Sequence, residues 1–100
     1  MIRFQRTAEV SGGKGAEATQ WAKEVTEYIN THFAEAQLLV FEPRFGTLNT
    51  IHWIADVEDL ASLDRWQQQI GADEGYLELL SKATDLFIAG SIVDTVLTSI

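Results

Sequence analysis

Acid–base and anion-binding side chains lie close together in the segment EPRFGTLNTIHW, residues 42 to 53. Glu42 supplies a carboxylate and His52 an imidazole, and an imidazole serves as a general base near neutral pH. Arg44 supplies a planar guanidinium that can bind a carboxylate or an enolate through paired hydrogen bonds. These side chains interrupt stretches whose other residues are typical of buried strands. The direction in which each side chain points therefore depends on how these strands are placed.

Strands are predicted over residues 2–10, 36–45 and 47–57, the last two forming a hairpin around Gly46 and Thr47. Successive side chains of a strand point to opposite faces, so the sheet should have one apolar and one polar face. The predicted apolar face includes Ile2, Phe4, Leu39, Phe41, Ile51 and Trp53. The predicted polar face carries the candidate site residues Arg3, Gln5, Glu42, Arg44, Thr50 and His52.

Each candidate has an alternative role. His52 is either a general base, with Glu42 orienting it, or a hydrogen-bonded sheet residue at a subunit interface. Arg3 and Arg44 either bind an oxyanion or pair with acidic side chains of the same face, Glu9 and Glu42, because an unpaired buried charge is costly.

Helices are predicted from apolar residues at helical spacing. The longest covers residues 16–33. Asp59 is the expected N-cap of a helix from Leu60 to Ile70. A second helical segment is expected from Tyr76 to about Asp85, and the tryptophans are expected in the core.

The element order is therefore β-α-β-β-α-β, which predicts an α+β, ferredoxin-like fold with a four-stranded antiparallel sheet and helices on one face. Right-handed crossovers place the first and third strands in the centre. Pro43 agrees with an edge position for strand 36–45, since proline cannot donate to a ladder. A long last strand is expected from Phe87 to Leu97, with a bulge or a close backbone approach at Gly90. Residues 1–100 are expected to form a single domain.

Composition argues against several classes of protein. With 15 acidic and 7 basic residues, the net charge is −8, and a partner with a phosphate backbone requires a basic surface. The central strands also offer no outward aromatic residue on which a base could stack. The chain contains no cysteine and no spacing typical of a metal site, so neither a metal nor another cofactor is expected. No signal peptide or membrane span is recognised, which predicts a cytoplasmic protein.

The most specific stretches are EPRFGTLNTIHWIADVEDLASLDRWQQQI and ADEGYLELLSKATDLF. They combine a glycine hairpin, a strand with an inward tryptophan, an acidic cap and a short second helical segment. On these stretches, and over nearly its whole length, the chain resembles the dimeric α/β-barrel superfamily, which includes antibiotic-biosynthesis monooxygenase-like and NIPSNAP-like proteins. The resemblance implies a homodimer whose two sheets pack into a barrel.

The resemblance also implies a small-molecule-binding protein, or a cofactor-independent oxygenase or isomerase of an enolisable substrate. His52 would then take a proton, and Arg3 or Arg44 would hold the oxyanion of a small, partly anionic ligand. Haem degradation is not expected, since related haem-degrading enzymes use an asparagine on the first strand, where this chain has Gln5. The alternative is a structural or regulatory dimerisation module with a filled barrel. A cavity of roughly 300 Å³ or more would favour a ligand.

Overall fold

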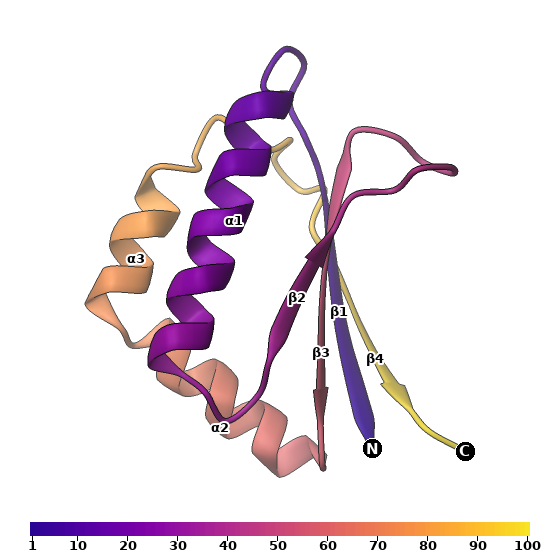
Figure 1. Ribbon diagram of the computed structural model, residues 1–100, viewed down its shortest axis with the longest axis vertical. Helices are drawn as coiled ribbons and strands as arrows, with labels where there is room; N and C mark the ends of the chain where they lie inside the picture. Colours follow the sequence, from indigo (N-terminus) through magenta and orange to yellow (C-terminus); the bar gives the residue numbers. More distant parts are fainter.

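The four strands form one antiparallel sheet in the order β2-β3-β1-β4, and the helices lie against one of its faces (Figure 1). A computed structural model describes all residues, 1–100. The elements follow the chain as β1 (Ile2–Glu9), α1 (Gly15–His32), β2 (Leu38–Phe41), β3 (Thr50–Val57), α2 (Leu60–Gly71), α3 (Glu74–Ser81) and β4 (Val93–Thr98). The predicted ferredoxin-like fold, with β1 and β3 in the centre, is confirmed. None of the helices is both long enough and apolar enough to span a membrane.

Aspartate side chains cap the two shorter helices. Asp59 accepts a hydrogen bond from the Ser62 amide at 2.8 Å, which confirms it as the N-cap of α2. Asp73 accepts one from the Tyr76 amide at 2.9 Å and caps α3. Each cap satisfies an amide that has no partner within its helix. Because Asp73 is the cap, α3 begins earlier than the expected Tyr76, and it ends at Ser81.

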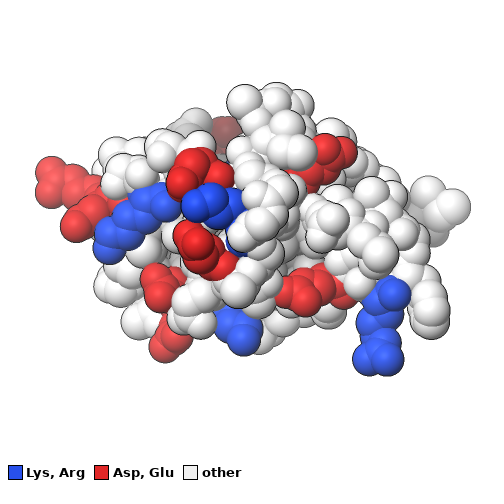
Figure 2. Space-filling model, turned by 90° about the horizontal axis from the view of Figure 1, so that it is seen from above, with Lys and Arg blue, Asp and Glu red and all other residues white.

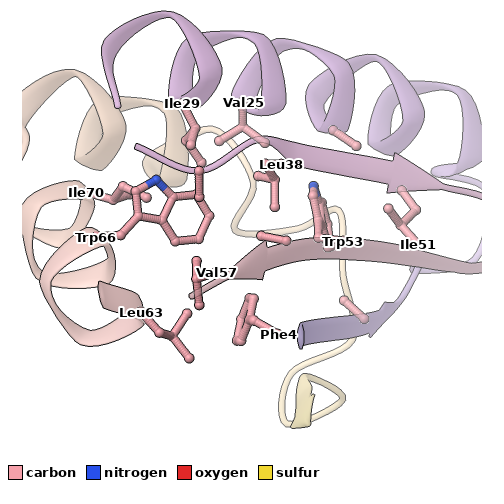
Figure 3. Packing of buried hydrophobic residues seen from close by; sticks show 14 of the residues in the cluster. Phe4, Val25, Ile29, Leu38, Ile51, Trp53, Val57, Leu63, Trp66 and Ile70 are labelled. Atoms are coloured by element: carbon pink, nitrogen blue, oxygen red, sulfur yellow. The ribbon is translucent and has the colours of Figure 1, made fainter. Parts of the chain in front are cut away.

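The core fills the space between the sheet and the helices. Trp53 projects from β3 toward α1, and Trp66 of α2 lies near Ile29 and Ile70 (Figure 3). The Trp53 indole donates to the Thr26 hydroxyl at 3.2 Å, and the Trp66 indole donates to the Phe33 carbonyl at 3.1 Å. Both buried N–H groups are therefore satisfied, as large aromatic core residues require.

The connection between β2 and β3 is longer than the predicted hairpin. β2 ends at Phe41 and β3 begins at Thr50, so residues 42–49 form a loop. Pro43 lies two residues after the end of β2 and has no amide hydrogen for the ladder, which helps to prevent the pairing from continuing. Gly46 and Asn49 have φ angles of 98° and 59°, a left-handed conformation that glycine and asparagine tolerate best. The edge position of β2 is confirmed.

The predicted face assignment of β2 is wrong. Leu38 is buried, whereas Leu39 and Phe41 are exposed on the face that no helix covers. The reason is register, since Leu38 pairs with Ala55, a buried residue of β3, and opposite residues share a face. Asn30 of α1 also fixes Leu38, because its side chain bonds both the amide and the carbonyl of Leu38, at 2.8 and 2.9 Å.

The predicted long last strand is also wrong. Phe87 forms only an isolated bridge with Val10, and regular pairing with β1 resumes at Val93 opposite Thr7. Five residues separate Phe87 from Val93, whereas two separate their partners Thr7 and Val10, so residues 88–92 interrupt the regular ladder. The Ile88 amide still donates to the Glu9 carbonyl of β1 at 2.9 Å. Gly90 lies in this excursion with a φ angle of 78°. The glycine therefore marks an irregularity of the expected kind, but one large enough to end the strand.

Candidate functional site

Arg3 is paired on the uncovered face of the sheet. Its Nε lies 2.8 Å from Asp56 Oδ1 and its Nη2 lies 3.0 Å from Asp56 Oδ2. The hydrogen bond and charge of Asp56 raise the pKa of Arg3, and the Arg3 hydrogen bond lowers the pKa of Asp56. Asp56, not the expected Glu9, is its partner, and the carboxylate-binding edge of Arg3 is occupied.

His52 and Thr50 lie together on the same face. His52 Nε2 is 2.9 Å from Thr50 Oγ1, and this hydroxyl donates to the Thr47 carbonyl at 2.9 Å. Because the hydroxyl has one hydrogen and a carbonyl can only accept, His52 Nε2 must be the donor to Thr50. In the neutral ring, Nδ1 is then the nitrogen that can accept a proton. Gln5, on neighbouring β1, is half-buried opposite Ile54.

Glu42 and Arg44 do not join this group. The Glu42 carboxylate accepts a hydrogen bond from the Thr19 hydroxyl of α1 at 2.6 Å, so Glu42 turns toward the helices. Its expected place on the uncovered face is therefore wrong, and no Glu42–His52 pair forms. Arg44 lies exposed in the loop between β2 and β3, outside any ion pair.

A cavity of about 510 Å³ lies on the other side of the sheet, between the strands and the helices. Of its 22 lining residues, 16 are hydrophobic, so its wall suits an apolar molecule. The wall includes all three tryptophans, Trp21, Trp53 and Trp66, together with Tyr76 and Leu80 of α3. The excursion before β4 contributes Ile88, Ala89, Gly90 and Ile92. The interrupted last strand thus helps to form this cavity.

Three aromatic rings form one side of the cavity. The ring centroids of Trp21 and Trp53 are 6.3 Å apart, and Phe87 lies 5.6 Å from Trp21 and 6.2 Å from Trp53. The Trp21 indole donates to the Leu79 carbonyl at 2.8 Å. The indole N–H groups of Trp21 and Trp53 are therefore used within the protein, and this side of the cavity offers mainly ring surface.

One ion pair borders the cavity. Arg6 of β1 and Asp94 of β4 are directly opposite in the sheet register. Arg6 Nε and Nη2 donate to the two Asp94 carboxylate oxygens at 2.7 and 2.8 Å. The Asp94 hydrogen bond raises the pKa of Arg6, to which the Tyr76 hydroxyl also contributes, and the Arg6 hydrogen bond lowers the pKa of Asp94. Both groups therefore stay ionised near neutral pH, and neither is suited to proton transfer.

Five residues border this cavity with polar groups, and none of them was predicted from the sequence as a site residue: Arg6, Gln67, Tyr76, Thr84 and Asp94. One signal was present. Arg6 falls on the apolar side of a central strand, where its charge must meet a partner or the wall of a cavity. Asp94 carried no comparable signal, because its partner depends on where β4 begins. No group of three or more His, Cys, Asp or Glu side chains has the geometry of a metal site.

Charge is distributed in separate groups on the surface. Figure 2 shows acidic and basic side chains interspersed on the face seen from above. This face has no continuous basic stripe of the kind that a phosphate backbone requires.

Solved structures of other proteins share this fold. An uncharacterised NIPSNAP domain protein from Burkholderia xenovorans is 18% identical, with a TM-score of 0.84 over 100% of this chain and 95% of that chain. A NIPSNAP family protein from Agrobacterium tumefaciens is 16% identical, with a TM-score of 0.82 over 99% and 92%. SnoaB, a cofactor-independent oxygenase from Streptomyces nogalater, is 16% identical, with a TM-score of 0.68 over 98% and 91%.

At these identities the likeness concerns the fold, and it confirms the predicted resemblance to dimeric α/β-barrel proteins. No curated protein matches the chain. A family model described as "Family of unknown function (DUF6039)" matches residues 2–85, and the chain therefore belongs to this family.

Proposed function

We propose that this protein is a homodimer that binds a small, largely apolar molecule in the cavity of each subunit. The cavity volume of about 510 Å³ carries the proposal. Ligand sites commonly measure roughly 300–1,000 Å³, and they combine an apolar wall with a few polar groups. A purely structural dimerisation module has no need of such a cavity, so the alternative predicted from the sequence is less well supported.

The cavity changes which residues the ligand would meet. Trp21, Trp53 and Phe87 would contact its apolar body, and Arg6 and Tyr76 its polar group. The candidates on the uncovered face lie outside the cavity lining: Arg3, Gln5, Thr50 and His52, as do Glu42 and Arg44. In this proposal, His52 and Thr50 belong to the subunit interface, which was the alternative role of His52.

A cofactor-independent oxygenase is the second candidate. The structural likeness to SnoaB and the aromatic wall of the cavity favour it. Among the lining residues, Arg6 and Asp94 hold each other ionised, so no strong base faces the ligand near neutral pH. The substrate would therefore have to be an acidic phenol or enol. An isomerase is less well supported, because it needs a group that removes and returns a proton.

The uncovered sheet face supports the homodimer. Its exposed apolar residues come from both edge strands: Leu39, Phe41, Val93 and Leu97. All six residues of β4 are exposed in the single chain. Burying apolar surface is the main driving force for association, and a second copy of the same face would supply it.

Ligand-detected NMR with naphthalene-based compounds tests the proposed binding. Ala83 borders the cavity, so Ala83→Phe should fill part of it and abolish binding. Ala61→Phe makes the same change on an exposed position of α2 and should leave binding intact. Circular dichroism checks that both variants fold. Equal binding by both variants, or none by the wild-type protein, would contradict a ligand site in this cavity.

A further inference from the structure

We infer that the cavity selects uncharged ligands with a carbonyl or hydroxyl oxygen, and that Asp94 determines this selectivity by cancelling the charge of Arg6. The inference rests on the proposed ligand-binding function and adds the chemical class of the ligand. It concerns the polar end of the cavity, where Arg6 and Asp94 are the only charged residues of the lining.

The sheet itself holds this ion pair in place. Arg6 and Asp94 are direct partners in the antiparallel register of β1 and β4, so the backbone fixes their separation. The contact is bidentate, at 2.7 and 2.8 Å. Their side chains are 37% and 41% exposed, which places the pair at the mouth of the cavity rather than in the closed core.

The pair leaves hydrogen-bonding capacity without net charge. Asp94 engages Nε and Nη2 of Arg6, so neither of these hydrogen bonds uses Nη1. A guanidinium has five N–H donors, and those on Nη1 remain for a ligand oxygen. Tyr76 also lines the cavity, close enough to Arg6 to affect its pKa, and a tyrosine hydroxyl can donate or accept.

A charged ligand gains too little here to offset its desolvation. A carboxylate moved into a largely apolar cavity needs a cation, but Arg6 is already paired with Asp94. An ammonium group faces the same difficulty, because Asp94 already serves Arg6. A carbonyl or hydroxyl oxygen needs no counter-ion, and it can accept from Nη1 without breaking the pair. The uncharged ligand is therefore favoured by its lower cost of desolvation and by its hydrogen bond to Nη1.

Three probes with one ring system test the selectivity: 2-acetylnaphthalene, 2-naphthoate and 2-naphthylmethylammonium. Isothermal titration calorimetry at pH 7 measures each dissociation constant. We expect the wild-type protein to bind the neutral ketone about tenfold or more tightly than either ion. Asp94→Asn keeps the shape of the side chain but leaves Arg6 uncompensated. The affinity of the Asp94→Asn variant for 2-naphthoate should therefore rise about tenfold relative to its affinity for the ketone.

The matched control is Asp56→Asn. Asp56 makes an equally bidentate pair with Arg3, but on the uncovered face of the sheet. This variant changes the net charge as Asp94→Asn does and should keep the wild-type ratio of affinities for the three probes. The double change Arg6→Gln with Asp94→Asn should restore the preference for the ketone.

The outcomes distinguish a failure of the inferred selectivity from a failure of the proposed ligand binding. If the wild-type protein binds 2-naphthoate as tightly as the ketone, the selectivity is absent and the inference fails, while ligand binding stands. The same follows if Asp94→Asn and Asp56→Asn give the same ratio of affinities for 2-naphthoate and the ketone. If none of the probes binds the wild-type protein, the proposed function and the inference both fail. The ranking by the wild-type protein tests the ligand class even if a variant does not fold, and the comparison of Asp94→Asn with Asp56→Asn tests the role of Asp94.

Discussion

The Tyr28 hydroxyl of α1 donates a hydrogen bond to Asp73 Oδ2 at 2.6 Å, and Asp73 is the residue that caps α3. The same carboxylate oxygen accepts from the Tyr76 amide at 2.9 Å. One oxygen therefore joins α1 to the first turn of α3. Since Tyr76 and Leu80 of α3 line the cavity, this contact positions part of its wall.

Gly75→Ala should destabilise the protein, because Gly75 lets Tyr28 approach α3. A β-carbon at position 75 would overlap the Tyr28 hydroxyl. Overpacking of this kind typically costs about 1–3 kcal/mol of the free energy of unfolding, measurable by urea denaturation. Gly71→Ala is the control, since a β-carbon there meets nothing within 4 Å. It should be neutral or stabilise the end of α2 by up to about 1 kcal/mol. Equal stability of both variants would refute the close approach.

The Tyr28–Asp73 contact should make stability depend on pH. Hydrogen bonds from Tyr28 and the Tyr76 amide lower the pKa of Asp73 below its ordinary value of 3.8. A carboxyl group whose pKa is lower in the folded protein contributes stability above its unfolded pKa, and this stability is lost as the pH falls through the folded pKa. The stability difference between wild-type protein and Asp73→Asn should therefore shrink below about pH 4.

The alkaline side has the opposite sign. The hydrogen bond to Asp73 raises the pKa of Tyr28 above its ordinary value of 10.0. The contribution of Tyr28 to the stability of the fold is fully present below its unfolded pKa and is lost as the pH rises through its folded pKa. Urea denaturation of the wild-type protein and Tyr28→Phe from pH 3 to pH 11 checks both limbs. A stability difference that stays constant over this range would show that the contact does not form.

The long elements could be predicted from the sequence because their patterns are local. α1 buries Ala18, Ala22, Val25 and Ile29 at helical spacing, and Asp59 stands directly before α2. β2 offered no such signal. Its residues are LLVF, which are apolar in both phases, so the buried side is decided by pairing with β3 and by Asn30 of α1. Both contacts join residues from different elements, so no local sequence pattern indicates them.

The cavity could not be predicted for a related reason. It is bounded by β1, α3 and the excursion before β4, and their meeting depends on tertiary structure. The alternation of side chains along the strands correctly indicated that Arg3 and His52 avoid the core. It also led to the prediction of a site on the uncovered face of the sheet. The ion pair of Arg6 with Asp94 joins residues 88 positions apart. Only the charge of Arg6 on an apolar phase pointed to the side of the sheet where the cavity lies.

Trp53→Ala should cost far more stability than His52→Ala. Trp53 is 7% exposed and projects into the core, so its removal should cost about 3–5 kcal/mol as a large-to-small change. His52 bonds Thr50 on the other face, and its removal should cost about 1 kcal/mol or less. Urea denaturation of the two variants compares them directly. Equal losses would mean that the two faces of β3 are reversed.

The homodimer predicts opposite outcomes for two substitutions of equally exposed apolar residues. Phe41 lies on the uncovered sheet face and Leu77 lies on α3, and each is 48% exposed. If two sheets pack together, Phe41→Glu buries an unpaired carboxylate at the interface and should convert the dimer to a monomer. Leu77→Glu adds the same charge on the helical side, which stays in water, and should leave the dimer intact. Sedimentation equilibrium at micromolar concentration measures both. A wild-type monomer, or dissociation caused by Leu77→Glu rather than by Phe41→Glu, would show that the sheet face is not the interface.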